Sequence, residues 1–266
     1  MIGIVGNGFV GNAVYQNFRD KTSCKVYDVD KNRSLNTLGE VINEDFIFVC
    51  LPTPMRYGGE CDLSILDDFF ESLPDPNFAH ITGTFVIKST VPIGTTKKYY
   101  ERFNVIHNPE FLTARNAIKD FANSERNIVG GDMELCVDFV RMFEQYFPNI
   151  PSIITDSDES EAIKYFSNTF LAYKVAYFNK IYDVCQAVGM DYDLVCKGVT
   201  ADSRIGKSHT KVPGIDNDRG FGGTCFPKDL NSLIVQMENH GVNSDMLKEV
   251  WKYNEQIRKV IDWPVT

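Results

Sequence analysis

The stretch Ile2-Gly3-Ile4-Val5-Gly6-Asn7-Gly8-Phe9-Val10-Gly11 decides the fold of the first half of the chain. An apolar run typical of a buried strand leads directly into three glycines with the spacing Gly-x-Gly-x-x-Gly. At a strand-to-helix turn, the first glycine allows the tight turn, the second lets the backbone approach a pyrophosphate, and the third lets the helix pack closely on the strand. The pattern therefore predicts a dinucleotide-binding turn, in which the cofactor contacts come from Gly6, Gly8, Phe9, Val10 and Gly11.

An acidic residue downstream indicates which dinucleotide binds. Asp28 follows an expected strand at residues 24–27, at the distance of about 20 residues from the glycine turn that such folds use. A carboxylate in this place accepts hydrogen bonds from the adenosine ribose hydroxyls and repels a 2′-phosphate, so we predict NAD rather than NADP as the cofactor. Arg33 lies shortly after Asp28 and either contacts the adenosine or is a solvated loop charge; the sequence leaves both interpretations open.

Hydroxyl side chains follow two later expected strands. Thr53 lies in Leu51-Pro52-Thr53-Pro54, and Thr90 lies in Lys88-Ser89-Thr90-Val91-Pro92-Ile93-Gly94-Thr95. Cofactors of open α/β sheets bind at the carboxyl ends of the strands, so we expect both threonines to contact NAD. Ordinary turn chemistry is the alternative for each.

The order of the expected elements gives the fold class. Up to about residue 156, short β-rich runs alternate with helix-like segments, which indicates a parallel sheet covered by helices on both faces. We predict an α/β protein with a Rossmann-like, doubly wound, mostly parallel sheet in an NAD-binding domain (residues 1–156), followed by an all-α domain with a long central helix (residues 157–266). The expected strands are residues 2–5, 24–27, 46–51, 85–88, 105–107, 127–129 and 152–154, and the later helices are 159–188, 230–241 and 245–259, with a loop over 207–223.

Composition excludes several classes of protein. The net charge of -9 argues against nucleic-acid binding, because such proteins neutralise phosphates with clustered Lys and Arg. Seven cysteines without a Cys-x-x-Cys pair fit neither a disulfide framework nor a zinc site, so we expect a reducing compartment and no metal. The chain opens on an apolar strand without a basic leader and lacks an apolar run of about 18 residues, so we expect a cytoplasmic protein without a membrane segment.

One cysteine stands in a setting that suggests chemistry. Cys225 lies in Gly220-Phe221-Gly222-Gly223-Thr224-Cys225-Phe226-Pro227-Lys228-Asp229. A dehydrogenase needs no thiol to oxidise an alcohol to an aldehyde, but a thiol can hold the aldehyde as a thiohemiacetal for a second oxidation. The pairing of a nucleotide turn with this cysteine therefore suggests oxidation from alcohol to acid. A nearby Lys164 or Lys228 would favour the reactive thiolate.

The long expected helix carries three polar residues on one face. Glu161, Lys164 and Asn168 are spaced so that their side chains project from the same side, with an ammonium and an amide donor one turn apart. Polar stripes on helices are usually solvated, and that interpretation stands beside a catalytic one.

Taken in order along the chain, these motifs resemble those of the UDP-glucose/GDP-mannose dehydrogenase family. The resemblance covers nearly the whole chain, and its most specific element is the run from Gly220 to Asp229. It implies a two-step, four-electron oxidation of the C6 alcohol of a nucleotide sugar to the carboxylate, with two NAD consumed. UDP-glucose is the expected substrate. The other matching segments are the glycine turn, Pro52–Pro54, Lys88–Gly94, Asn108–Leu112, Glu161–Asn168, Phe170–Ala172 and Asp202–Gly206.

The resemblance also implies a role for individual residues. Cys225 matches the nucleophile, and Lys164 with Asn168 matches the pair that stabilises oxyanions. Asp229 matches the acid that orients water and Lys164, and Glu110 matches the base that activates water for thioester hydrolysis. Thr90 resembles the threonine that holds the catalytic water, Arg204 resembles an arginine that reaches the sugar site of a neighbouring subunit, and the residues expected to contact substrate are Glu110, Phe111, Leu112, Lys164, Asn168, Arg204, Phe221 and Gly222.

Two departures from the family pattern bear on function. A second glutamate is common in the family at the position of Ala114, so either Glu110 acts alone or the second oxidation is impaired. Typical members also continue into a third, nucleotide-like domain that grips the substrate. Lys207, Lys211 and Arg219 are candidates for phosphate contacts here, with solvated loop charges as the alternative.

Other functions remain open at the level of sequence. The base and sugar are unresolved, so GDP-mannose and UDP-N-acetylhexosamines are alternatives to UDP-glucose. A β-hydroxyacid-type dehydrogenase that transfers a single hydride shares the two-domain plan but needs no thiol, and an NAD-binding remnant without catalysis is a third interpretation. We also expect a homodimer, because the long helices must bury apolar faces and because Arg204 matches a contact in trans.

Overall fold

Successive side chains of the strands are buried on opposite faces of the sheet, so the sheet has a hydrophobic core on each face. Ile4 and Phe48 belong to one buried cluster, whereas their chain neighbours Val5 and Val49 belong to a second, because successive side chains of a strand point to opposite faces. The computed structural model describes the backbone of residues 1–266 and all side chains except those of residues 77 and 78.

The sheet contains seven strands in the order β2-β1-β3-β4-β5-β6-β7. All neighbouring pairs are parallel except β5 and β6. The chain moves from β1 to β2 on one side and returns to β3 on the other, so a topological switch point lies between β1 and β3, where open α/β sheets bind ligands. The strands are β1 (Ile2–Val5), β2 (Cys24–Tyr27), β3 (Phe46–Val49), β4 (Thr84–Ile87), β5 (Val105–His107), β6 (Asn127–Gly131) and β7 (Ser152–Thr155).

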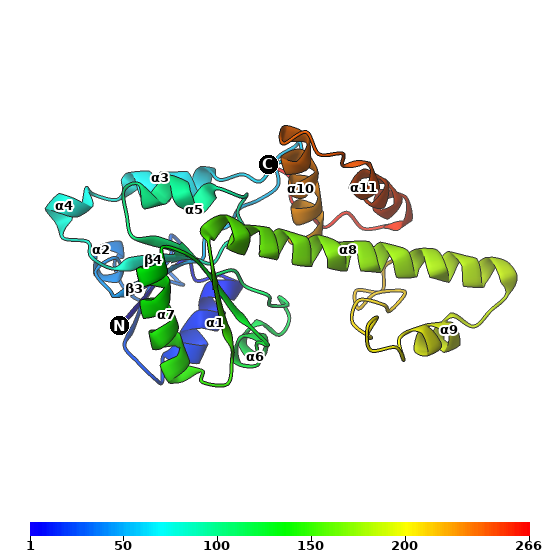
Figure 1. Ribbon diagram of the computed structural model, residues 1–266, viewed down its shortest axis with the longest axis horizontal. Coiled ribbons are helices and arrows are strands. Elements are labelled where there is room, and N and C mark those ends of the chain that lie inside the picture. Colours follow the sequence, from blue (N-terminus) through cyan, green and yellow to red (C-terminus); the bar gives the residue numbers. More distant parts are fainter. The chain divides into compact units, whose positions relative to one another are not determined.

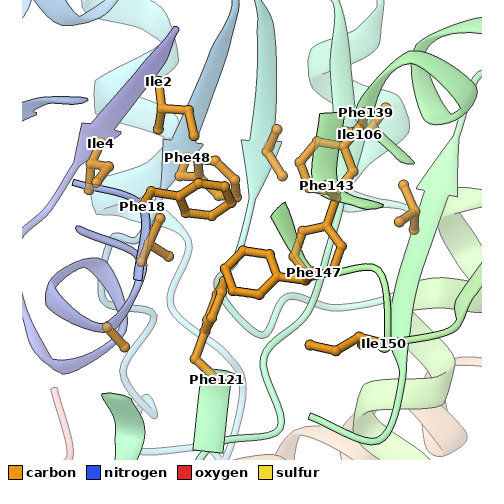
Figure 2. Packing of buried hydrophobic residues seen from close by; sticks show 14 of the residues in the cluster. Ile2, Ile4, Phe18, Phe48, Ile106, Phe121, Phe139, Phe143, Phe147 and Ile150 are labelled. Atoms are coloured by element: carbon orange, nitrogen blue, oxygen red, sulfur yellow. The ribbon is translucent and has the colours of Figure 1, made fainter. Parts of the chain in front are cut away.

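Helices cover both faces of this sheet (Figure 1). Figure 2 shows the core on one face, where phenylalanines from α1, α6 and α7 meet the strands. Phe18 and Phe147 meet edge to face with ring centroids 5.1 Å apart, a favourable aromatic geometry. The helices are α1 (Phe9–Phe18), α2 (Leu38–Val41), α3 (Ser64–Ser72), α4 (Pro76–Ala79), α5 (Thr95–Tyr100), α6 (Ala117–Ala122) and α7 (Met133–Tyr146).

The rest of the chain is helical. The helices are α8 (Ser157–Val188), α9 (Tyr192–Val199), α10 (Phe226–Asn239) and α11 (Asp245–Ile257), and α10 packs against α11. Gly189, with φ of 72°, ends α8 as expected. α10 begins at Phe226, earlier than the expected residue 230, because Pro227 stabilises a first turn. α9 was not expected, and Asp191 caps it by accepting hydrogen bonds from the Asp193 and Leu194 amides.

The chain forms two compact units. Unit 1 comprises Met1–Thr53 and Leu63–Lys164, and unit 2 comprises Pro54–Asp62 and Tyr165–Thr266. The division falls inside α8 rather than at residue 156, and the domain boundaries expected from the sequence stay a prediction. The Rossmann-like, mostly parallel sheet with a helical part is confirmed. Among the residues that the structure describes, no helix is both long and apolar enough to span a bilayer.

Candidate active site

The glycine turn between β1 and α1 has the geometry that a pyrophosphate requires. Gly6 has a φ of 87°, and a Cβ on Gly11 would lie 1.9 Å from the Gly6 carbonyl oxygen. A Cβ on Gly8 would meet nothing within 4 Å, so the backbone there is open to a ligand. The turn leads into the N-terminus of the ten-residue α1, whose amide groups and dipole favour a bound anion.

Asp28 and Arg33 lie beside this turn. The Asp28 carboxylate accepts hydrogen bonds from the Asn7 amide at 2.6 Å and the Asp30 amide at 2.8 Å, which fixes it at the end of β2. The Asn7 side chain donates to the Arg33 carbonyl at 2.7 Å. The Arg33 guanidinium is exposed and lies 3.5 Å from the Asp30 carboxylate. These residues fit the adenosine end of NAD, with Asp28 held and Arg33 at the surface.

The two threonines expected at the cofactor are brought together. Thr53 is buried, and its hydroxyl donates to the Thr90 carbonyl at 2.9 Å. Ser89 donates to the Leu51 carbonyl at 2.5 Å. These hydrogen bonds join the segments that follow β3 and β4, so both threonines lie at the carboxyl edge of adjacent strands, where sequence reasoning placed them.

A buried ion pair organises the turn after β5. The Lys164 ammonium, on α8, donates to the Glu110 carbonyl and lies 3.1 Å from its Oε1 atom. Their side chains are only 3% and 6% exposed. The other Glu110 oxygen accepts the Leu112 amide at 2.5 Å, and the ammonium lies 5.2 Å from the Phe111 ring centroid. The structure therefore gathers Lys164 with the whole Glu110–Leu112 segment, an arrangement that satisfies both buried charges.

Lys88 is a buried cation that sequence reasoning missed. Its ammonium donates to the side-chain oxygen of Asn108 at 2.9 Å, and the side-chain nitrogen of Asn108 donates to the Asn127 side chain at 2.8 Å. Burial lowers the pKa of Lys88 to about 8. The available signal was a lysine directly after the apolar run Phe85–Ile87. Lys88 and Glu110 also line a small pocket together with Phe111 and Arg126.

Glu161 has a structural role in unit 1. Its carboxylate accepts hydrogen bonds from the Gly94 amide at 2.6 Å and from the Thr96 amide at 2.8 Å, so it caps the start of α5. Burial raises the pKa of Glu161 to about 7, although these donors act in the opposite direction. It therefore serves helix capping and is not a third member of a catalytic stripe with Lys164 and Asn168.

In unit 2, the Asp229 carboxylate is held from two sides. Asn168 donates its side-chain N–H to one oxygen at 2.6 Å, and the Lys228 ammonium lies 2.7 Å from the other. The Asp229 side chain is 1% exposed. Burial acts to lower the pKa of Lys228, but the Asp229 carboxylate, with smaller effects from Cys61 and Cys225, raises it. Lys228 therefore stays an ammonium group near the cysteine.

Cys225 immediately precedes α10 and is partly exposed. Its sulfur lies 3.7 Å from the Thr224 hydroxyl. A helix N-terminus and a nearby ammonium both favour a thiolate. Burial instead raises the pKa of the Cys50 and Cys136 thiols to about 12, which makes them poor nucleophiles. All seven cysteines are free thiols.

Other predicted substrate residues have distinct surroundings. The Phe221 ring is buried in the core of unit 2 with Leu230, so its ring packs inside the unit. Gly222 lies beside the Arg258 guanidinium. Arg204 is 87% exposed and pairs with Asp202 on a surface loop.

The candidates for phosphate contacts also differ from one another. Arg219 donates to the Asp183 carboxylate at 2.6 Å and to the Asn179 carbonyl at 3.2 Å, so its guanidinium anchors the loop to α8. Lys207 and Lys211 are exposed, as solvated charges are.

Three features are typical of the Rossmann class of dinucleotide-binding proteins and of the dehydrogenases among them. They are a glycine turn at the switch point of a parallel sheet, an acid at the end of the next strand, and a helical unit with a partly exposed cysteine. Residues 34–147 match the NAD binding domain, and residues 158–256 the central domain, of the UDP-glucose/GDP-mannose dehydrogenase family. The chain belongs to this family, and its cofactor is NAD.

Named relatives agree with this assignment. The UDP-glucose 6-dehydrogenase of Rickettsia conorii is 36% identical over 226 residues, which cover 82% of this chain and 50% of that protein. UDP-glucose 6-dehydrogenase TuaD of Bacillus subtilis is 32% identical, with 97% of this chain and 63% of that protein covered. The chain thus spans between half and two thirds of the length of these two relatives.

Solved structures share the fold. A UDP-glucose dehydrogenase from Pyrobaculum islandicum superposes with a TM-score of 0.85 and 26% identity, over 96% of this chain and 68% of that one. The 3-hydroxyisobutyrate dehydrogenase of Mycobacterium tuberculosis has a TM-score of 0.74 at 15% identity, over 96% of this chain and 92% of that one, a likeness of fold alone.

Proposed function

We propose that this chain is an NAD-dependent nucleotide-sugar 6-dehydrogenase that oxidises UDP-glucose to UDP-glucuronate in two steps. The observation that carries the proposal is the partly exposed Cys225 at the start of α10, next to the buried Lys228–Asp229 ion pair. A thiol in this setting suits a reaction in which an aldehyde is captured and oxidised again. The relatives named UDP-glucose 6-dehydrogenase support the choice of substrate.

The first oxidation converts the C6 alcohol to an aldehyde. The hydroxyl loses its proton to a water that the fixed Asp229 carboxylate orients, and the Thr90 segment holds water near the cofactor. NAD, when bound, accepts the hydride that leaves C6 in each of the two oxidations. The Lys164 ammonium and the Asn168 amide are preorganised donors for the developing alkoxide, because each is buried and already fixed by a carboxylate partner.

The second oxidation uses the thiol. The Cys225 thiolate adds to the C6 aldehyde, and the new C–S bond gives a thiohemiacetal whose oxyanion is stabilised by Lys164 and Asn168. Loss of a hydride from C6 leaves a thioester on Cys225. A water then attacks the thioester carbonyl, Glu110 takes the proton from this water, and cleavage of the C–S bond releases the carboxylate and the thiolate.

Glu110 carries this hydrolysis without a second carboxylate nearby in sequence. Ala114 is exposed and supplies no acid-base group at the position where the family commonly has a glutamate. The Lys164 ammonium and the Leu112 amide hold the Glu110 carboxylate in one orientation. We therefore assign the water-activating role to Glu110 alone.

We propose that a second copy of the chain covers one face of α8. Phe166, Phe170, Tyr173 and Tyr177 recur at helical spacing and are exposed, Phe170 by 64%. An apolar stripe of this length on a helix favours association. The exposed Arg204 is then available to a sugar site in trans, and the loop at Phe221 and Gly222 lines the substrate site.

The stoichiometry of NADH release tests the proposal. Limiting UDP-glucose, GDP-mannose or UDP-N-acetylmannosamine is incubated with the purified chain and excess NAD. We expect about two NADH per UDP-glucose, since the thioester route removes two hydrides. About one NADH per sugar would contradict the second step. No NADH while NAD still binds would favour a non-catalytic role or a requirement for sequence outside this chain.

A further inference from the structure

The loop that leads to Cys225 is held in place by contacts with residues outside the loop. Residues 216–225 form neither helix nor strand. A loop without internal ladders leaves backbone polar groups that need partners elsewhere, and fixing its backbone costs conformational entropy. Part of this requirement is met by α8, where the Asn179 side chain accepts the Gly220 amide at 3.2 Å. Further partners come from a second segment, the end of α11 and the residues that follow it, 254–262.

Asn254 recognises the loop backbone directly. Its side-chain oxygen accepts the Phe221 amide at 2.7 Å, and its side-chain nitrogen donates to the Phe221 carbonyl at 2.9 Å. The side chain is 0% exposed. The fit is close, because a Cβ on Gly220 would lie 2.3 Å from the Asn254 oxygen. A carboxamide that pairs with both the backbone N–H and the backbone C=O of one residue bonds as a neighbouring strand would, and it fixes the backbone in one position.

Charged side chains make further contacts between the loop and this segment. The Arg258 guanidinium, 2% exposed, lies 2.8 Å from the Asp216 carboxylate and 3.1 Å from that of Asp262. Asp262 in turn accepts the Gly223 amide at 3.0 Å. Asp218 accepts two amides of the segment, from residues 259 and 260, at 3.0 and 2.9 Å. The contacts therefore run from residue 216 to residue 223, two residues before the cysteine.

We propose that Asn254 is a positioning residue for Cys225. It fixes the backbone at Phe221, whose ring is simultaneously anchored in the core, and Asp262 fixes Gly223, so that the thiol is presented at the N-terminus of α10. This role rests on the proposed function, in which Cys225 is the nucleophile. An asparagine that served only to stabilise unit 2 would have no effect on the reactivity of the thiol beyond its effect on unfolding.

The experiment compares Asn254→Leu and Asn254→Asp with a matched control, Asn239→Leu, at an exposed position near the end of α10. The first readout is the rate at which iodoacetamide alkylates Cys225, followed by peptide mass spectrometry over a range of pH. We expect Asn254→Leu to slow alkylation at pH 7 by about tenfold, because the displaced loop no longer holds the thiol at the helix N-terminus that favours the thiolate. Asn254→Asp keeps the acceptor for the Phe221 amide, so its rate should be intermediate.

The second readout is activity together with NAD affinity. For Asn254→Leu we expect NADH per UDP-glucose to fall from about two toward about one and kcat to fall more than KM, with NAD affinity unchanged. Alkylation rates and pH profiles equal to those of the control would overturn the positioning role. If Asn254→Leu does not fold, Asp262→Ala removes the Gly223 contact from a partly exposed side chain and is judged by the same criteria.

The two proposals can fail separately. A wild-type chain that releases no NADH with any nucleotide sugar contradicts the proposed function. The alkylation comparison does not depend on turnover, so it still decides whether Asn254 controls the thiol.

Discussion

Asn168 donates to the Asp229 carboxylate at 2.6 Å, so the long helix α8 and the helix that follows the cysteine share a buried hydrogen bond. The same carboxylate pairs with Lys228. A carboxylate that is removed from water needs partners for its charge, and here an amide donates to one oxygen while an ammonium forms an ion pair with the other. The arrangement connects a stability requirement with the proposed oxyanion donor, because the Asp229 side chain holds the Asn168 side chain in place.

Asp229→Asn should therefore damage both stability and activity. The change leaves the buried Lys228 ammonium without its counter-ion, which costs about 3–5 kcal/mol in comparable sites. We expect a lower unfolding midpoint for the protein and a kcat at least about 100-fold lower, since the general acid-base contribution is of this size. Asp193→Asn, on the surface, is the matched control. Normal kcat in Asp229→Asn would remove the carboxylate from the mechanism.

Cys225→Ser separates cofactor binding from acid formation. The residues predicted to contact NAD lie in unit 1, so we expect the NAD affinity to be unchanged. Formation of the uronate should collapse, because a serine hydroxyl forms no comparable covalent adduct. Titration calorimetry with NAD and chromatographic detection of UDP-glucuronate measure the two effects. Cys24→Ser, at a thiol whose pKa burial raises to about 11, is the control. Wild-type uronate production by Cys225→Ser would contradict the thiol route.

The parts of the site that follow local rules were predictable from sequence. The glycine turn depends on three residues and a strand, and Asp28 lies at a fixed distance from them, so their positions in the fold could be predicted, while their contacts with NAD stay a prediction. The partner of Lys164 was not predictable, because Glu110 lies 54 residues away and the contact exists only after folding. The sequence-based expectation that Asp229 orients Lys164 missed this pairing.

The helices and strands were likewise predictable only where the local sequence determines them. The expected strands agree with the observed ones to within about two residues, the uncertainty usual for element boundaries. The antiparallel pairing of β5 with β6 was not resolved in advance, since strand direction depends on the connection. Asn254 gave no sequence signal, because its partner is a backbone peptide rather than a side chain.

Asp28→Ala should weaken NAD binding and relax the discrimination against NADP. The carboxylate is held by the Asn7 and Asp30 amides, so its removal deletes an acceptor for the ribose hydroxyls and a repulsive charge toward a 2′-phosphate. We expect about tenfold weaker NAD binding, equivalent to one lost charge-assisted hydrogen bond. Fluorescence titration with both cofactors measures this, with the exposed Asp20→Ala as control. Unchanged affinity would place the adenosine site elsewhere.

Glu161 should make stability depend on pH. Burial raises its pKa in the folded protein to about 7, above the ordinary 4.5. Between these values the unfolded chain has lost the proton and the folded chain retains it, so the unfolded state binds fewer protons and stability falls as pH rises. The full loss is on the order of 3 kcal/mol and is complete above about pH 7.

Denaturant unfolding at pH 4.5 and 7.5 measures this dependence. In Glu161→Gln the decline over that interval should be absent, although the amide caps α5 less well and lowers stability at both pH values. Glu159→Gln, an exposed neighbour on α8, controls for the loss of a surface charge. Equal pH slopes in wild type and Glu161→Gln would assign the dependence to other groups.

Phe170→Glu should prevent the proposed dimer. The ring is 64% exposed in the single chain, and a second copy that covers it would have to bury the new carboxylate without a partner. We expect sedimentation velocity at about 10 μM to show a dimer for the wild type and a monomer for Phe170→Glu. At this concentration, a loss of a few kcal/mol in the free energy of association is enough to dissociate a dimer of moderate affinity. Val242→Glu, at an exposed position away from α8, is the matched control. A wild-type chain that is monomeric and fully active would contradict both the dimer and the role of Arg204 in trans. If Phe170→Glu still sediments as a dimer, the interface lies on another face.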